Sequence, residues 1–190
     1  TNIQSLNKGL LTYGTETRTT NDWVLKARAN VFTNWLVEYI QKHGTQVLAT
    51  PAFANRNYSI NSNSFEPRLT FTQNTKFRAQ VGYQYILQKN RIANFEKSTS
   101  NNINTELKYN ATNRTSLLVR GSYNGINFTG DANSTTGFLL LNGLLPGTNY
   151  LWGVELTQRL INNLEISIQY DGRKPGETPA IHRGTASVQA

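Results

Sequence analysis

The 190-residue sequence contains no cysteine, no methionine and no long apolar run. Without cysteine the chain has neither a disulfide framework nor a thiolate metal site. No segment approaches the roughly 20 consecutive apolar residues that a membrane-spanning helix needs, and the mean hydropathy is −0.50. These absences exclude a helical membrane protein and a disulfide-stabilised secreted domain. The lack of methionine predicts a processed protein or a fragment of a longer chain.

Aromatic residues are plentiful for so polar a chain, with nine Tyr, eight Phe and three Trp. Transmembrane β-strands combine these two traits, because only every second residue of such a strand has to suit lipid. The formal net charge of +8 predicts an anionic neighbour such as nucleic acid, lipopolysaccharide phosphates or an acidic protein. The length is that of a single domain.

One stretch shows the main pattern of the chain. Residues 77–90 read FRAQVGYQYILQKN, with apolar or aromatic side chains at the odd positions from Phe77 to Leu87 and mostly polar ones at even positions. Successive side chains of a strand point to opposite faces, so this stretch predicts a strand with one apolar and one wet face. The pattern recurs and predicts nine strands, near 23–31, 35–45, 63–71, 77–90, 101–110, 115–127, 148–160, 164–172 and 180–190.

The connections between these strands alternate in length. Short ones are expected at 32–34, 73–76, 111–114 and 161–163, and longer polar ones around 46–62, 91–100, 129–148 and 172–180. Transmembrane barrels have this asymmetry, with short periplasmic turns and long extracellular loops. The density of Asn, Gly and Thr predicts no helix of any length.

The predicted fold is therefore all-β, an antiparallel up-and-down transmembrane β-barrel. Even strand parity requires a tenth strand, which the poorly alternating segment 5–16 would supply, so residues 1–20 are an N-terminal strand or an entry segment. Residues 1–190 then form one barrel domain of about ten strands, or the C-terminal strands of a larger barrel.

Both faces of the predicted strands have a distinctive composition. The polar face carries charges of both signs, as expected for side chains that interlock in a narrow lumen. The predicted lumen-facing charged residues are Lys26, Arg28, Glu38, Glu66, Arg68, Arg78, Glu106, Lys108, Arg120, Glu155, Arg159, Glu165 and Asp171.

The apolar face concentrates aromatic residues near the strand ends, as in the interfacial girdles of outer-membrane barrels. The predicted lipid-interface aromatics are Trp23, Trp35, Phe71, Phe77, Tyr83, Tyr85, Tyr109, Tyr123, Tyr150, Trp152 and Tyr170. An amphipathic soluble sheet with a charged wet face is the alternative.

The last third of the chain carries a set of turn glycines, a tryptophan-bearing strand and a closing histidine. These residues are Gly143, Leu144, Pro146, Gly147, Asn149, Trp152, Tyr170, Gly172, Arg173, Lys174, Ile181, His182 and Gly184. With them the chain resembles the closing segment of large Bacteroidota outer-membrane β-barrel proteins, convincingly over 135–190 and more loosely over 20–134. The resemblance implies an outer-membrane location and a place in a larger envelope complex, and it supplies no catalytic residues. Such barrels usually end on an aromatic residue, whereas this sequence ends at Ala190.

The sequence gives little support for catalysis or for a bound metal or cofactor. His43 and His182 are the only histidines, and both are expected at the extracellular rim. Neither lies in a recognisable nucleophile motif, and two histidines without a carboxylate cluster are too few for a structural metal. We therefore predict a protein that is not an enzyme and that uses no cofactor.

An apolar segment, FLLLNGLL at 138–145, is unusual in an extracellular loop. It is expected to extend a strand, to plug the lumen or to dock a partner. The residues of this possible partner-docking loop are Phe138, Leu139, Leu140, Leu141, Leu144 and Leu145.

The predicted function is an integral outer-membrane protein with a structural, envelope-complex or transport-associated role. Its expected partners are outer-membrane lipid, lipopolysaccharide and other envelope proteins. The alternative is a soluble or secreted β-sheet binding module that binds nucleic acid or glycan. Single-strand binders place aromatic and basic residues on the same face, but here they lie on opposite faces, so nucleic acid is not the expected partner.

Overall fold

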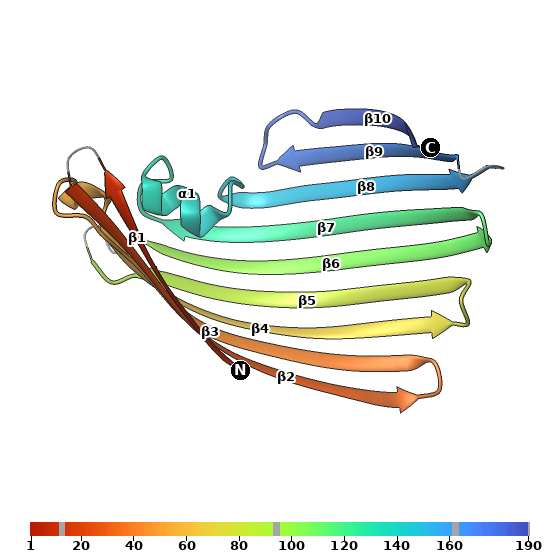
Figure 1. Cartoon of the computed structure of the whole chain (residues 1–190), viewed down its shortest axis with the longest axis horizontal. Helices are drawn as coiled ribbons and strands as arrows, with labels where there is room; N and C mark the ends of the chain where they lie inside the picture. Colours follow the sequence, from red (N-terminus) through yellow and green to blue (C-terminus); the bar gives the residue numbers. More distant parts are fainter. Residues whose placement is uncertain (12–13, 93–95, 161–163, 190) are drawn as a thin grey trace.

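The computed structural model describes residues 1–11, 14–92, 96–160 and 164–189. Ten strands form a single antiparallel sheet in which each strand pairs with its neighbours in sequence (Figure 1), which confirms the all-β, up-and-down prediction. The strands are β1 (Asn2–Leu11), β2 (Gly14–Phe32), β3 (Trp35–Ala49), β4 (Tyr58–Gln73), β5 (Phe77–Asn90), β6 (Lys97–Thr112), β7 (Thr115–Thr129), β8 (Gly147–Arg159), β9 (Glu165–Pro175) and β10 (Ile181–Gln189).

The strand register keeps the alternating pattern in phase across the sheet. Leu69 of β4 lies opposite Val81 of β5, whereas Thr70 lies opposite Gln80, which in turn lies opposite Glu106 of β6. A slip of one residue would move a whole set of side chains to the other face. The sheet curls (Figure 1), and we call the face that carries Gln80 the concave face and the face that carries Val81 the convex face.

Several strands extend beyond their predicted ends. β2 begins at Gly14 and not near 23, β4 begins at Tyr58 and not near 63, and β3 continues to Ala49. The residues added to β2 are polar or glycine and do not alternate. Those added to β4 put Tyr58 and Ile60 on the concave face, out of phase with Phe65 of the same strand, so the alternation that marks the rest of the strand does not include them. Backbone ladder bonds need no apolar side chain, and the pairing of β2 with β3 simply continues as far as Thr17 and Ala49.

The two ends of the sheet differ as predicted. Connections of two or three residues, 33–34, 74–76 and 113–114, lie at what we call the short-turn end. The connections 50–57, 91–96, 130–146 and 176–180 lie at the opposite, long-loop end. The turn predicted at 161–163 falls outside the described residues. Longer strands make the long loops shorter than the sequence suggested.

The N-terminal segment differs from its prediction. A single strand over 5–16 is wrong, because β1 ends at Leu11 and β2 begins at Gly14. Gly14 has a φ of 143°, a conformation that glycine adopts much more readily than other residues. The tenth strand predicted from parity is nevertheless present as β1, paired along its length with the first half of β2.

The sheet is open over the described residues. β1 pairs only with β2 and β10 only with β9, so the two strands are edges (Figure 1). Closure into a barrel is therefore not seen, and only the ten-stranded, up-and-down sheet is common to prediction and structure.

The prediction that the chain has no helix is wrong for one of the long loops. Helix α1 (Thr135–Leu141) begins after Ser134, whose hydroxyl accepts a hydrogen bond of 2.8 Å from the backbone N–H of Gly137. It ends at Asn142, a left-handed residue with φ 51°. A shorter 3₁₀ turn covers Ala54–Arg56. None of the described helices is long and apolar enough to cross a membrane.

Helix α1 lies on the concave face at the long-loop end (Figure 1). Its Leu140 packs with Leu48 of β3 and with Tyr58 and Ile60 of β4, while Phe128 of β7 packs against the same cluster. β3 and β4 are separated from β7 by two other strands. The helix therefore connects distant parts of the sheet across its concave side and supports the curl.

A buried carboxylate fastens this helix to the loop before β6. Glu96 is 2% exposed and accepts hydrogen bonds from Asn90 Nδ2 at 2.8 Å and from the Ser134 hydroxyl at 3.1 Å. Asn90 also accepts a bond from the backbone N–H of Ser59 at 3.0 Å. This polar contact joins β4, β5 and the start of α1 at the long-loop end.

Candidate functional site

The predicted site residues separate completely by face. By strand register, every predicted lumen-facing charged residue lies on the concave face and every predicted lipid-interface aromatic lies on the convex face. The burial of the two faces is the opposite of the usual arrangement, in which apolar side chains are buried and polar ones are exposed. Polar residues of the concave face are among the most buried of the chain, whereas large apolar residues of the convex face are exposed.

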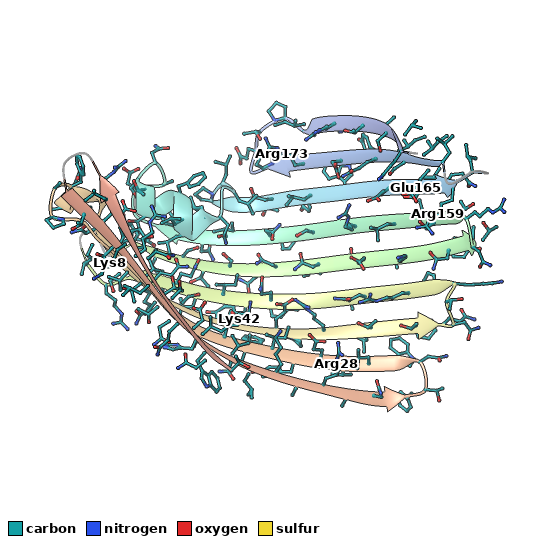
Figure 2. All side chains as sticks on the ribbon, viewed as in Figure 1. Lys8, Arg28, Lys42, Arg159, Glu165 and Arg173 are labelled. Atoms are coloured by element: carbon teal, nitrogen blue, oxygen red, sulfur yellow. The ribbon has the colours of Figure 1, made fainter. Side chains whose placement is uncertain are left out.

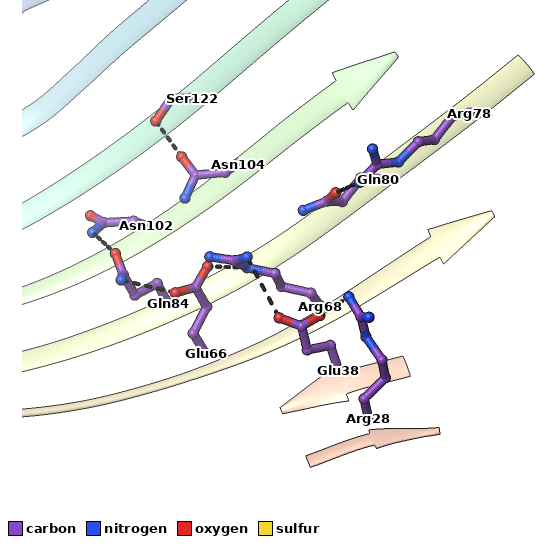
Figure 3. A network of polar contacts seen from close by, with 10 residues as sticks. All are labelled: Arg28, Glu38, Glu66, Arg68, Arg78, Gln80, Gln84, Asn102, Asn104 and Ser122. Atoms are coloured by element: carbon purple, nitrogen blue, oxygen red, sulfur yellow. Dashed lines mark hydrogen bonds and ion pairs between the residues drawn. The ribbon is translucent and has the colours of Figure 1, made fainter. Parts of the chain in front are cut away.

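A network of charged and amide side chains occupies the middle of the concave face (Figure 3). Arg28 Nη2 lies 3.1 Å from Glu38 Oε2, and the other oxygen of Glu38 lies 3.8 Å from Arg68 Nη1. Arg68 also donates to Glu66, whose second oxygen accepts from Gln84 Nε2 at 3.2 Å. Four strands, β2 to β5, are thereby joined through their side chains.

Neutral side chains extend this network to β6, and a separate group of them joins β6 to β7. Asn102 donates to Gln84 Oε1 at 3.2 Å, and Ser122 donates to Asn104 Oδ1 at 2.8 Å (Figure 3). Asn124 in turn donates to the Ser122 hydroxyl at 3.0 Å. The site predicted from the sequence contains only charged residues of this face, so these neutral side chains are not part of it. Their signal in the sequence is the Ser and Asn residues at alternate positions, at 98–104 of β6 and at 122–124 of β7.

The predicted interlocking of charges is only partly present. Two further pairs join Arg120 to Glu155 at 3.3 Å and Arg159 to Glu165 at 2.8 Å. Within the described part of the chain, the other predicted charged residues form no ion pair, although Asp171 accepts a hydrogen bond from Gln169. Those residues are Lys26, Arg78, Glu106, Lys108 and Asp171.

The carboxylates of the concave face are expected to contribute unequally to the stability of the protein. Glu66→Ala removes the acceptor of both Arg68 and Gln84 from a site that is only 7% exposed. We expect the free energy of unfolding to fall by about 2–3 kcal/mol, because the Gln84 amide loses its acceptor and the Arg68 guanidinium keeps only the longer contact with Glu38. Glu155→Ala, which breaks a more exposed pair, should cost less than about 1 kcal/mol. Denaturant titration of both variants measures the difference, and equal losses would contradict the network's role.

The aromatic residues of the convex face form two belts. At the short-turn end, Trp35 packs on Phe71 at 4.9 Å between ring centroids, and Phe71 lies 6.2 Å from Phe77. Nearer the long-loop end, Phe65 lies 5.6 Å from Tyr85. Phe77 and Tyr85 are eight residues apart on β5, or about 26 Å along the strand at roughly 3.3 Å per residue. For a strand tilt of about 40° this is roughly 20 Å measured perpendicular to the belts.

The second belt continues across β7 and β8. Tyr123 and Tyr150 pack with ring centroids 5.5 Å apart. Between the belts the convex face is apolar and exposed, with Val81 44%, Ile103 44% and Ile168 53% accessible. An exposed apolar surface that spans the sheet is unusual for a soluble monomer and marks a surface for interaction.

Charge on the convex face is confined to one end. Strand alternation places every Asp and Glu of the described strands on the concave face. The convex face carries only lysines, which lie toward the long-loop end, as Figure 2 shows for Lys8. Lys89 and Lys97 lie directly opposite each other on β5 and β6. The convex lysines are Lys8, Lys89, Lys97 and Lys174.

Both histidines lie on the convex face near the long-loop end. His182 stacks on Tyr170 with an interplanar angle of 14°, and its Nδ1 lies 2.7 Å from the Tyr170 hydroxyl. Trp152 lies 5.9 Å from the same imidazole. His43 is exposed opposite Trp23. The described residues contain no group of three or more His, Asp or Glu side chains placed to hold a metal ion.

The Trp152 indole lies over Gly172 of the neighbouring strand, where an added Cβ would overlap the ring. Gly172→Ala should therefore displace the indole and lower the free energy of unfolding by about 1–3 kcal/mol. Gly184→Ala is the matched control on the same face, because nothing lies within 4 Å of its Cβ position. Unfolding midpoints and tryptophan emission report both changes. An unaltered Gly172→Ala protein would show that the indole is not held over this glycine.

The apolar loop 138–145 has a buried part and an exposed part. Leu140 and Leu141 are 1% and 3% exposed, so they belong to the packed interior and are not available to a partner. Phe138 is 65% exposed, and Leu139 and Leu145 are also accessible. The expected strand extension is wrong for 135–141, because this segment forms α1 and covers part of the concave face.

No protein-family model matches the chain, and no curated protein or solved structure is significantly similar to it.

Proposed function

We propose that this chain is an integral outer-membrane β-barrel protein, or the ten-stranded part of one, with its convex face in lipid and its concave face toward a lumen. Its proposed role is structural or transport-associated within a cell-envelope complex, and not catalytic. The short-turn end would face the periplasm and the long-loop end the cell exterior, as in other outer-membrane barrels.

One observation carries this proposal, the reversed burial of the two faces. The concave face buries Asn149, Ser98 and Glu66, each less than 9% exposed, while the convex face exposes Val81 and Ile168. In water such a surface is unfavourable by roughly 25 cal/mol for each Å² of apolar area. In a bilayer the same surface is favourable, and the polar interior is shielded from hydrocarbon.

The vertical order of residues on the convex face supports the same placement. The aromatic belts enclose an apolar band of roughly the height expected for a bilayer, and charge appears only at the upper belt, where Lys174 lies opposite Tyr150, and beyond it. Lys89 lies four residues past Tyr85, about 10 Å further along the normal at the same tilt. A lysine at that height would lie among the phosphate groups of outer-leaflet lipids.

The proposal requires that both edge strands of the sheet find a hydrogen-bonding partner in the membrane. An open strand edge does not occur in hydrocarbon, because its backbone N–H and C=O groups would have no partner. β1 and β10 are both edges here. In the membrane they would have to pair with each other, in a barrel of about ten strands, or with further strands of a larger barrel.

Gel mobility tests the proposal directly. The chain should require detergent for solubility, and the folded species should migrate differently from the same sample after heating, because a closed barrel resists unfolding in sodium dodecyl sulfate. A protein that stays monomeric and soluble without detergent would instead support the soluble binding module.

A further inference from the structure

A second candidate site lies on the concave face at the short-turn end. A cavity of about 500 Å³ opens there between two turns, 74–76 and 113–114, and the facing ends of β6, β7, β8 and β9. Arg159 and Glu165 mark this end in Figure 2. Apart from one alanine, the lining consists of hydroxyl, amide and charged side chains. The charged ones are Lys76, Lys108, Arg114, Arg159 and Glu165.

The charges of this cavity do not balance. Four cations line it with a single carboxylate, and that carboxylate already pairs with Arg159 at 2.8 Å. In the part of the chain that the structure describes, Lys76, Lys108 and Arg114 form no ion pair. The middle of the same face differs, because Arg28 and Arg68 are neutralised there by Glu38 and Glu66.

The strand register gives a second, independent indication that positive charges at this end of the sheet lack a partner of opposite charge. Arg78 of β5 lies directly opposite Lys108 of β6, with both side chains on the concave face. Like charges placed directly opposite on a sheet are destabilising. Two residues further along the same strands, Gln80 lies opposite Glu106, and Glu106 lies opposite Arg120 of β7. On the concave face of β5 and β6 the repulsive pairing is thus confined to the rim of the cavity, because the other like-charged pair of these strands, Lys89 and Lys97, lies on the convex face.

We propose that this cavity binds a multivalent anion, one that carries two or more carboxylate or phosphate groups. Its volume lies within the roughly 300–1,000 Å³ of small-molecule sites, which is larger than a single oxyanion needs. Its cations come from separate elements, so an extended anion can contact several of them. Asn110, Ser116 and Thr157 line the same space and supply further hydrogen-bond donors.

Two sources present this chemistry, an acidic peptide segment that reaches the short-turn end and a small polyphosphate or polycarboxylate. The inference rests on the concave face alone and does not require that the convex face lies in lipid. A requirement for detergent therefore tests the proposed function, and anion binding tests this site.

The experiment uses the full chain in detergent micelles, titrated calorimetrically with tripolyphosphate and with a hexaglutamate peptide at low salt. The double variant Lys108→Gln/Arg114→Gln should weaken binding at least tenfold. The matched control, Lys89→Gln/Lys97→Gln, removes the same charge from the convex face and should change binding less than twofold. Binding should also weaken as salt is raised, because exposed charges are screened.

Binding of either probe supports the site, and the tighter one identifies the source. Equal losses in both double variants would attribute binding to net charge and overturn the proposal, as would no binding of either probe to the unmodified chain. Circular dichroism checks that each variant keeps its β-sheet. If the cavity variant does not fold, Lys76→Gln in an exposed turn replaces it, with an expected loss of at least threefold, and unchanged binding would overturn the proposal.

Discussion

Val81→Arg should largely prevent the chain from folding into liposomes. Val81 lies midway between Phe77 and Tyr85 on the convex face of β5, which the proposal places at the centre of the bilayer. An arginine on the lipid face near the midplane of a transmembrane barrel costs roughly 2–4 kcal/mol. Folding yield is measured as the heat-modifiable fraction on a gel after the unfolded chain is diluted into liposomes.

Gln80→Arg is the matched control, one residue away on the opposite face. Its new guanidinium would lie directly opposite Glu106 on β6, which forms no ion pair in the described part of the chain. We therefore expect a folding yield close to that of the unmodified protein. Equal tolerance of the two substitutions, or the reverse order, would show that lipid does not contact the convex face.

Leu140→Ala should destabilise the long-loop end of the sheet by about 2–5 kcal/mol, the usual cost of a cavity at a fully buried leucine. Leu140 is 1% exposed and packs α1 against Leu48, Tyr58 and Ile60. Loss of this contact should also loosen the helix itself. Denaturant titration measures the stability, and the rate of chymotrypsin cleavage at Phe138 reports on the release of α1.

Leu139→Ala, on the next residue of the same helix, removes an equal side chain that is 36% exposed. Its cost should be well below that of Leu140→Ala, because less contact is lost. Similar losses for the two leucines would mean that α1 is held by something other than the contact that Leu140 makes with β3 and β4.

The sequence predicts the sheet well because apolar and polar residues alternate with a two-residue period in the strands. For β5 both predicted ends, 77 and 90, agree with the structure. Where the apolar residues of a strand change face, as at Tyr58 and Ile60 of β4, the alternation loses its phase and the strand end is not predicted. Closure of the sheet is a long-range property, set by the pairing of β1 and β10, and no local pattern reports on it.

The helix and the neutral network show what a search for charges and periodicity misses. Ser134 before an apolar run, with Asn142 and Gly143 after it, is a recognisable set of helix start and stop signals. The predicted charged residues do share one face, but their pairing depends on register, which sets Arg28 opposite Glu38 and Arg78 opposite Lys108. Sequence alone gives the composition of a face, and only the register determines its contacts.

Tryptophan fluorescence in liposomes of brominated lipid tests the central claim most directly. All three tryptophans of the chain, Trp23, Trp35 and Trp152, lie on the convex face, and bromine quenches an indole only on close contact with the acyl chains. If lipid covers this face, emission from the folded chain should fall strongly relative to liposomes of unbrominated lipid. Emission that is the same in both kinds of liposome would contradict the account.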